Sequence, residues 1–145
     1  MTDPVGGPEA AERHWARGGE DGLPRAVAPF SQGVRVGSLV FTAGQASIDG
    51  DANDVAEGDI REQTAQTLRN VSLVLEHFGA SLRDVVKMTI WLRDFNDYAG
   101  MNEVYAEWFQ PPEPVRACVR SELVFPTLLV EMEAVAVVAP AGRAI

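Results

Sequence analysis

The spacing of apolar residues changes between residues 59 and 93, and this change constrains the fold more than any other feature of the sequence. From residue 60 to 78, mostly apolar residues recur at steps of four, four, three, four and three: Ile60, Thr64, Leu68, Val71, Leu75 and Phe78. These steps predict one buried stripe along a helix. Asp59, with Glu62 three positions later, predicts the start of the helix, and Gly79 predicts its end.

From residue 84 to 93 the apolar residues instead alternate, which is typical of a strand with one buried face. We expect this face to carry Val86, Met88, Ile90 and Leu92. The same reasoning predicts strands at 34–36, 38–43, 115–123 and 128–138, and a second helix at 96–109. Three prolines between residues 110 and 114 end the second helix in a loop.

The predicted order of elements is β-β-α-β-α-β-β, which indicates an α+β fold with two helices on one face of a single sheet. Such a layer leaves the other face of the sheet uncovered, and a second subunit is the usual cover. A chain of 145 residues is long enough for one domain with a substantial core. We place this domain at residues 24–140, before a C-terminal tail at 141–145.

Residues 1–23 differ in composition from the rest of the chain. The first 29 residues hold five of the 13 glycines and four of the nine prolines, so this stretch has little to bury. We expect residues 1–23 to form an N-terminal arm that is either flexible or packed on a neighbour. Within it, a short helix over Glu9–Arg17 would carry Trp15 as an anchor.

The charge balance excludes some classes of partner. The chain has 12 Lys and Arg residues against 21 Asp and Glu residues, a formal net charge of −9. Nucleic-acid affinity depends mainly on clustered basic residues, so we expect no nucleic-acid partner. There is no run of eighteen apolar residues and no signal-peptide core, so we expect a cytoplasmic protein without a membrane partner. The single cysteine and the distant His14 and His77 predict neither a disulfide framework nor a metal site.

Three features combine polar groups with an apolar setting. Arg116 sits near the start of an otherwise apolar strand, with Cys118 two residues later on the same face. Glu131 and Glu133 share a face of the last strand, where a carboxylate is either solvated or desolvated with a raised pKa. Gly44, just after a strand, offers free backbone N–H groups. These side chains also have purely structural interpretations. Arg116 fits a salt bridge at the rim, Glu131 and Glu133 fit a half-exposed strand, and Cys118 fits a small buried thiol. The pattern alone therefore assigns no activity.

Seven blocks of residues, in order and near the expected spacing from about Pro24 to Val138, carry a resemblance to a known family. The blocks are Pro29–Val34, Leu39–Gln45, Gln63–Thr64 with Asn70, Asp84–Thr89, Phe95–Tyr98 with Asn102–Tyr105, Pro114–Val119 and Val130–Ala136. The chain resembles the reactive-intermediate deaminase family, which is also called the Rid, YjgF or L-PSP endoribonuclease family.

The resemblance implies a fold like that of chorismate mutase, and a homotrimer with three clefts between subunits. It implies hydrolysis of enamines and imines, namely 2-imino acids, to 2-oxo acids and ammonia without a metal or cofactor. In this chain Arg116 would bind the substrate carboxylate, and Glu131 would activate the hydrolytic water. Gly44 and Cys118 would supply backbone contacts, and Asn102 a supporting contact. Arg116 and Glu131 are expected to converge on one hollow between protomers.

One departure from the family lies at the predicted cleft. The family usually has Pro-Tyr at the start of the first block, whereas this chain has Pro29-Phe30, so a rim hydroxyl is missing. This difference leaves open a tailoring enzyme dedicated to one biosynthetic imine or enamine. A non-catalytic trimer that binds small carboxylates is also left open. The net charge of −9 argues against ribonuclease activity, because it repels a polyanion.

Overall fold

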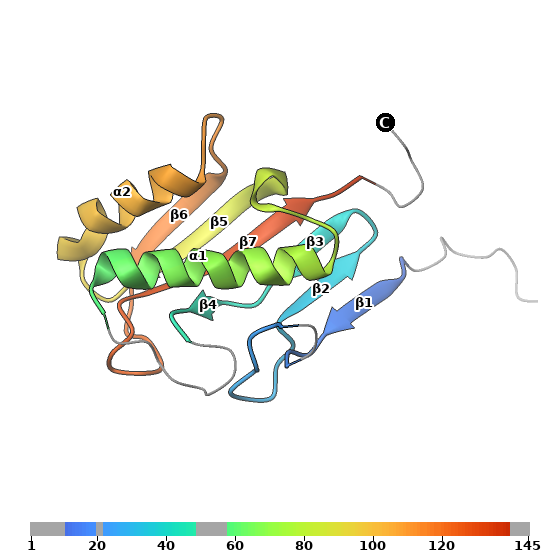
Figure 1. The fold of residues 1–145 in the computed structure, drawn as a ribbon, viewed down its shortest axis with the longest axis horizontal. Helices are drawn as coiled ribbons and strands as arrows, with labels where there is room; N and C mark the ends of the chain where they lie inside the picture. Colours follow the sequence, from blue (N-terminus) through green and yellow to red (C-terminus); the bar gives the residue numbers. More distant parts are fainter. Residues whose placement is uncertain (1–10, 20–21, 49–57, 140–145) are drawn as a thin grey trace, which may run out of the picture.

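A computed structural model describes residues 11–19, 22–48 and 58–139 of the chain. Two helices pack on one face of a sheet (Figure 1), so the predicted α+β architecture is confirmed. The helices are α1 (Ile60–His77) and α2 (Tyr98–Trp108), and the short 3₁₀ turns are η1 (Leu82–Asp84) and η2 (Phe95–Asp97). The strands are β1 (Arg13–Ala16), β2 (Gly33–Val36), β3 (Leu39–Thr42), β4 (Gln45–Ala46), β5 (Val85–Leu92), β6 (Val115–Arg120) and β7 (Val130–Val137).

The strands lie in the order β1-β2-β3-β7-β5-β6, and β4 also pairs with β7. Strands β5 and β6 are parallel because α2 crosses between them, whereas the other pairs are antiparallel. The last strand of the chain therefore lies in the interior of the sheet. The two-residue strand β4 was not predicted, since it is too short to show a period.

Helix α1 has the start, end and buried face that the sequence predicts. The Asp59 side chain accepts a hydrogen bond from the backbone N–H of Glu62 at 2.9 Å. Gly79 follows the helix with a φ of +79°, a conformation that favours glycine. Of the predicted stripe, Thr64, Leu68, Val71, Leu75 and Phe78 are buried. No helix in the described ranges has both the length and the apolar character needed to cross a membrane.

Strand β5 departs from the predicted alternation at its first residues. Its pairing with β7 shifts register between Val85 and Lys87, which is a β-bulge. Val85 is consequently buried and Val86 is 46% exposed, so the prediction that Val86 shares the buried face was wrong. The rest of the predicted face is fully buried, as expected: Met88, Ile90 and Leu92.

The described part of the N-terminal segment forms a strand rather than the predicted helix. Strand β1 pairs antiparallel with β2, and Trp15 lies opposite Val34. The open edge of β2 offers unpaired backbone groups, so edge pairing overrides a weak local helix signal. Trp15 is 61% exposed and does not anchor the strand within the chain. The sheet thus extends into the segment predicted as an arm, while residues 1–10 and the predicted tail at 141–145 lie outside the described residues.

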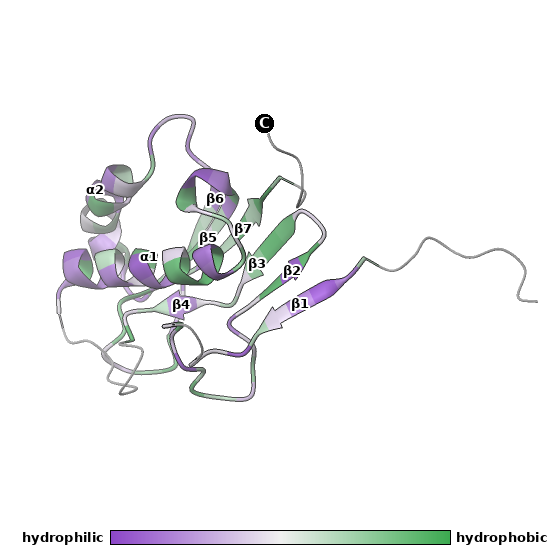
Figure 2. Cartoon of the chain, turned by 45° about the vertical axis from the view of Figure 1, so that its right-hand side comes forward, coloured by the Kyte–Doolittle hydropathy of each residue, from purple (hydrophilic) through white to green (hydrophobic). Residues whose placement is uncertain are grey.

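The face of the sheet away from the helices is uncovered in the single chain and carries exposed apolar side chains, beside the carboxylates of Glu131 and Glu133. Strands β3 and β7 are coloured as hydrophobic along most of their length (Figure 2). The exposed fractions of Leu39, Phe41, Val119 and Val137 lie between 38% and 44%. Contiguous apolar surface of this kind marks an interaction face. The expectation of an uncovered second face is therefore met.

Candidate functional site

Arg116 lies on the helix-covered face of the sheet. In the parallel β5–β6 pair it is opposite Met88, and Cys118 is opposite Ile90. Met88 and Ile90 are both fully buried beneath the helices, so Arg116 and Cys118 leave the sheet on that same side. A hollow of about 380 Å³, the Arg116 hollow, is lined by Phe95, Tyr98, Arg116 and Cys118.

Two tyrosines of α2 hold the Arg116 guanidinium. Nη2 of Arg116 donates a hydrogen bond to the Tyr98 hydroxyl at 3.2 Å. The guanidinium carbon lies 5.8 Å from the centre of the Tyr98 ring and 4.9 Å from that of Tyr105, within the range of cation–π contacts. Burial raises the pKa of Tyr105 to about 12, although Arg116 opposes the shift. In the described part of the chain Arg116 forms no ion pair, so its charge is available to a ligand.

Glu131 lies on the opposite face of the sheet. It alternates along β7 with the fully buried Val130 and Met132, so its side chain points away from the core. A hollow of about 260 Å³, the Glu131 hollow, surrounds it. The lining residues are Pro24, Arg25, Val27, Ala28, Phe30, Gln32, Gly44, Gln45, Ala46, Ile48, Asn70, Val124, Leu128 and Glu131.

The Glu131 carboxyl group is packed directly against Gly44. A Cβ added at Gly44 would overlap Oε1 of Glu131 and would lie 3.0 Å from its carboxyl carbon. Only a glycine therefore lets the carboxyl group approach this backbone. Burial, and to a lesser extent the neighbouring carboxylate of Glu133, raises the pKa of Glu131. A carboxylate with a raised pKa is a better base near neutral pH than an ordinary one.

The predicted site residues divide among three hollows of the single chain. Arg116 and Cys118 line the first, whereas Gly44, Phe30 and Glu131 line the second. Asn102 lines a third hollow of about 300 Å³, on the other side of Arg116, together with Tyr105, Ala106, Glu113 and Pro114.

Arg116 and Glu131 are separated along the sheet as well as across it. Arg116 is opposite Met88 and Glu131 is opposite Trp91, three positions further along β5. Three positions correspond to about 10 Å along a strand and, being an odd number, to opposite faces. One chain therefore does not bring the two side chains together.

Sequence reasoning did not single out the residues that hold Arg116. Tyr98 and Tyr105 fall within the second predicted helix, at 96–109, where aromatic residues at helical spacing are usually core. The signal that was available is their spacing of seven residues, which places both on one face of α2 above β6. The cation–π contact itself depends on how the helix lies over the strand.

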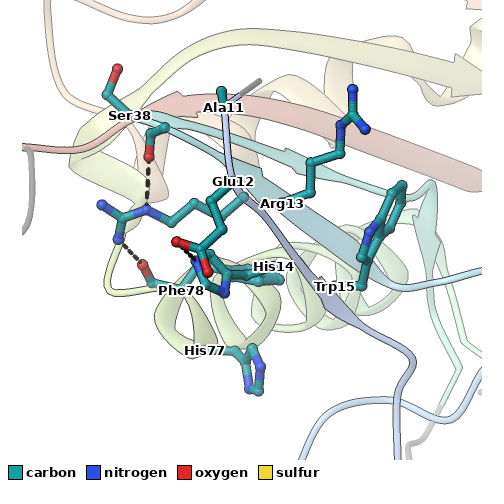
Figure 3. Close-up of a pocket in the computed structure, with 10 residues that line it drawn as sticks. Ala11, Glu12, Arg13, His14, Trp15, Ser38, His77 and Phe78 are labelled. Carbon is teal, nitrogen blue, oxygen red and sulfur yellow. Dashed lines mark hydrogen bonds and ion pairs between the residues drawn. The ribbon is translucent and has the colours of Figure 1, made fainter. Parts of the chain in front are cut away.

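A larger hollow, of about 1100 Å³, lies elsewhere, between β1, the β2–β3 turn and the end of α1 (Figure 3). Three of the charged groups there, those of Arg35, His14 and Glu12, already have partners. Arg35 donates to the carbonyl oxygens of Phe78 and Gly37 at 2.9 and 3.0 Å, and His14 pairs with Glu12 at 3.7 Å. Nor do three His, Cys, Asp or Glu side chains come together as metal ligands within the described ranges. We therefore locate the candidate site at Arg116 and Glu131.

The family model described as Endoribonuclease L-PSP matches residues 22–138, which is most of the chain. The chain belongs to this family. It is the Rid family predicted from the sequence, and it includes proteins named as deaminases of reactive intermediates.

Relatives in the Rid family match this chain over nearly their whole length. A RutC family protein of Pyrococcus abyssi is 45% identical over 113 residues, which cover 78% of this chain and 89% of that protein. A protein of Dermatophagoides farinae named 2-iminobutanoate/2-iminopropanoate deaminase is 36% identical over 115 residues, which cover 79% and 90%. The crystal structure of Escherichia coli TdcF with bound serine superposes with a TM-score of 0.76 at 32% identity, covering 91% of this chain and all of that one.

Proposed function

We propose that this protein hydrolyses 2-imino acids to 2-oxo acids and ammonia, at sites formed between copies of the chain in a homotrimer. The guanidinium of Arg116 carries the proposal: Tyr98 and Tyr105 hold it in a hollow, and no carboxylate of the described residues pairs with it. A guanidinium held in this way presents paired N–H donors that match a carboxylate. Membership of the Rid family, with a relative named as an imino-acid deaminase, supports the same reaction.

The position of Glu131 supports a site shared between copies. Arg116 and Glu131 lie on opposite faces of one sheet, so one chain holds only half of the site. The uncovered apolar face that carries Phe41 and Val137 gives a second copy a surface on which to pack. In a closed ring of three copies, Arg116 of each copy then meets Glu131 of a neighbour.

The reaction needs only one acid–base group once the substrate carboxylate is fixed. Water adds to C2 of the imine and gives its proton to the Glu131 carboxylate, which passes the proton to the nitrogen. The resulting tetrahedral carbinolamine carries one hydroxyl and one amino group on C2. In its collapse Glu131 takes the hydroxyl proton and delivers it to the amino group, so that the C2 carbonyl forms as the C–N bond breaks and ammonia leaves.

The remaining predicted residues have smaller parts in this proposal. The backbones of Gly44 and Cys118 contact the substrate next to the two charged groups. Asn102 supports Arg116 from the hollow on its other side. Imines hydrolyse readily in water, so positioning and one base are enough to lower the remaining barrier.

The first experiment measures activity directly. A 2-imino acid is generated in situ by an amino-acid-oxidising enzyme, and the release of ammonia is followed with and without this protein. We expect acceleration by the wild type and none by Arg116→Ala. If the wild type gives no acceleration but binds 2-oxo acids, the protein is a carboxylate-binding module instead.

A second experiment tests whether two copies share each site. Arg116→Ala and Glu131→Ala chains are co-expressed in equal amounts, so that copies mix at random in the assembly. A site with Arg116 from one copy and Glu131 from its neighbour is then intact in about one quarter of cases (one half times one half). We expect the mixture to recover about that fraction of wild-type activity, whereas a site within one chain recovers none.

A further inference from the structure

The polar amides that line the Glu131 hollow are already occupied within the chain. The Nε2 atom of Gln32 donates to the carbonyl oxygen of Pro24 at 3.0 Å, and that of Gln45 donates to Oε1 of Gln32 at 2.6 Å. The Nδ2 atom of Asn70 donates to the carbonyl oxygens of Ala46 and Ile48, both at 2.9 Å. Each of these amide nitrogens already has an acceptor within the chain, so a polar substrate side chain that enters the hollow loses water and gains few hydrogen bonds in exchange, which is unfavourable.

Most of the remaining lining is apolar. Proline, alanine and larger apolar side chains come from the segment before β2, from β4 and from the loop before β7. Phe30 contributes a ring without a hydroxyl and is 38% exposed, and Leu128 is buried below it. A hollow of about 260 Å³ lies near the small end of the range for ligand pockets, roughly 300–1,000 Å³, and suits one amino-acid-sized molecule.

Two side chains hold the loop at residues 121–129, which forms one wall of this hollow. Arg93 donates from Nε to the carbonyl oxygen of Leu128 at 2.7 Å, and from Nη2 to that of Phe125 at 2.8 Å. Gln63, 1% exposed, donates to the carbonyl oxygen of Thr127 at 2.8 Å and accepts from the backbone N–H of Leu129 at 2.9 Å. Because Arg93 and Gln63 together hold four backbone groups of the loop, the loop presents its side chains in a defined position.

Two side chains of this loop line the hollow: the buried Leu128 and the exposed Val124. Val124 is 77% exposed in the single chain, so its side chain is open to a ligand in the hollow. We propose that the Glu131 hollow selects 2-imino acids with branched aliphatic side chains, and that Val124 is a specificity-determining residue that packs against the substrate side chain. This inference rests on the proposed function, because it names the substrate class of that same site.

Arg25, an exposed cation that lines the same hollow, would favour a competing class of ligand, the dicarboxylic 2-imino acids. A substrate with a second carboxylate would pair with it. The apolar class is favoured because the other lining side chains are apolar or have their amide donors occupied. Each methylene in an apolar pocket contributes roughly 10- to 200-fold to discrimination.

The test uses stable 2-oxo acid products, so that it does not depend on turnover. Calorimetry on the full-length protein compares 4-methyl-2-oxopentanoate, 3-hydroxypyruvate, 2-oxoglutarate and pyruvate. We expect the branched ligand to bind at least about tenfold more tightly than the hydroxylated and dicarboxylic ones. Val124→Ser should reduce this preference severalfold while pyruvate binding changes by less than about twofold. Leu73→Ser, an exposed apolar position on α1 away from the hollow, should change none of these values.

Equal affinities in the wild type would overturn the proposal, and so would a Val124→Ser variant that weakens every ligand equally. Tighter binding of 2-oxoglutarate, lost in Arg25→Ala, would assign the hollow to dicarboxylic substrates instead. Failure of the proposed function looks different: the preference among 2-oxo acids remains, but no imine is hydrolysed faster.

Discussion

The central carbon of the Arg116 guanidinium lies 4.9 Å from the centre of the Tyr105 ring. Tyr98 completes the arrangement, because its hydroxyl accepts a hydrogen bond from Nη2 at 3.2 Å. Within the described residues the guanidinium makes no other hydrogen bond, so its remaining donors can meet a ligand. Arg116 is therefore oriented before a substrate arrives, which lowers the entropy lost on binding.

Replacing Arg116 by lysine should weaken binding of the substrate carboxylate at least about tenfold, although the charge is kept. Lysine presents one ammonium group instead of a planar fork, and it cannot stack on Tyr105 in the same way. The measurement is KM for a 2-imino acid, together with Kd for the matching 2-oxo acid. Arg83→Lys, at an exposed position on η1, is the matched control and should leave both constants unchanged. A KM for Arg116→Lys equal to that of the wild type would contradict the role of the fork.

The hydroxyl of Tyr105 is buried without a hydrogen-bond partner in the described part of the chain. Tyr105→Phe keeps the ring under Arg116 and removes this unpaired group. We therefore expect unchanged or increased stability in urea unfolding, by up to about 1 kcal/mol, and an unchanged KM. Tyr98→Phe removes a hydrogen bond to Arg116 and should raise KM severalfold. A clear loss of stability in Tyr105→Phe would show that its hydroxyl has a partner.

Gly44→Ala should reduce kcat/KM strongly, by about a hundredfold, with little change in Tm. The new Cβ would overlap Oε1 of Glu131, so the carboxyl group must swing away from its place. A misplaced catalytic group of this kind commonly costs about a hundredfold in rate. Gly37→Ala is a useful comparison, since no neighbouring atom lies within 4 Å of the new Cβ but the φ of +60° makes alanine strained. It should lower Tm and spare activity, which is the opposite pattern.

The activity should fall on acidification at a pH above the ordinary pKa of glutamate, about 4.3. Glu131 acts as a base only when deprotonated, and burial followed by the charge of Glu133 raises its pKa. Glu133→Gln removes the charge of Glu133 but leaves the effect of burial on the pKa of Glu131. The acid limb of kcat/KM should therefore move to lower pH but stay above the ordinary pKa of glutamate. Glu107→Gln, on the exposed side of α2, should not move it. Comparing variants on one substrate cancels the titration of the imine itself.

Phe41→Glu should break the assembly and abolish activity while the single chain stays folded. Phe41 is 39% exposed on the uncovered face of β3, so a charge there is tolerated in one chain but not against a second copy. Sedimentation measures the assembly, and circular dichroism measures the fold. A variant that remains assembled and active would show that another surface joins the copies.

Much of the fold follows from local patterns. The α1 helix is predictable because its stripe, its Asp59 cap and its Gly79 end lie within twenty residues, and each acts through near neighbours. Arg116 and Glu131 could also be chosen as site residues from the sequence, since each lies within a block of residues that carries the family resemblance. Strand β1 and the bulge at Val86 could not be predicted from the sequence, because both depend on how distant strands pair.

What the sequence cannot show by itself is toward which face of the sheet the side chains of Arg116 and Glu131 point. The side chains of Arg116 and Glu131 each follow the alternation of their own strand, but the sequence does not relate the phase of β6 to that of β7. Strand β5 sets this relation, because hydrogen bonds on its two edges align Met88 with Arg116 and Trp91 with Glu131. Backbone hydrogen bonding between segments far apart in the chain thus decides that the two groups lie on opposite faces, three positions apart.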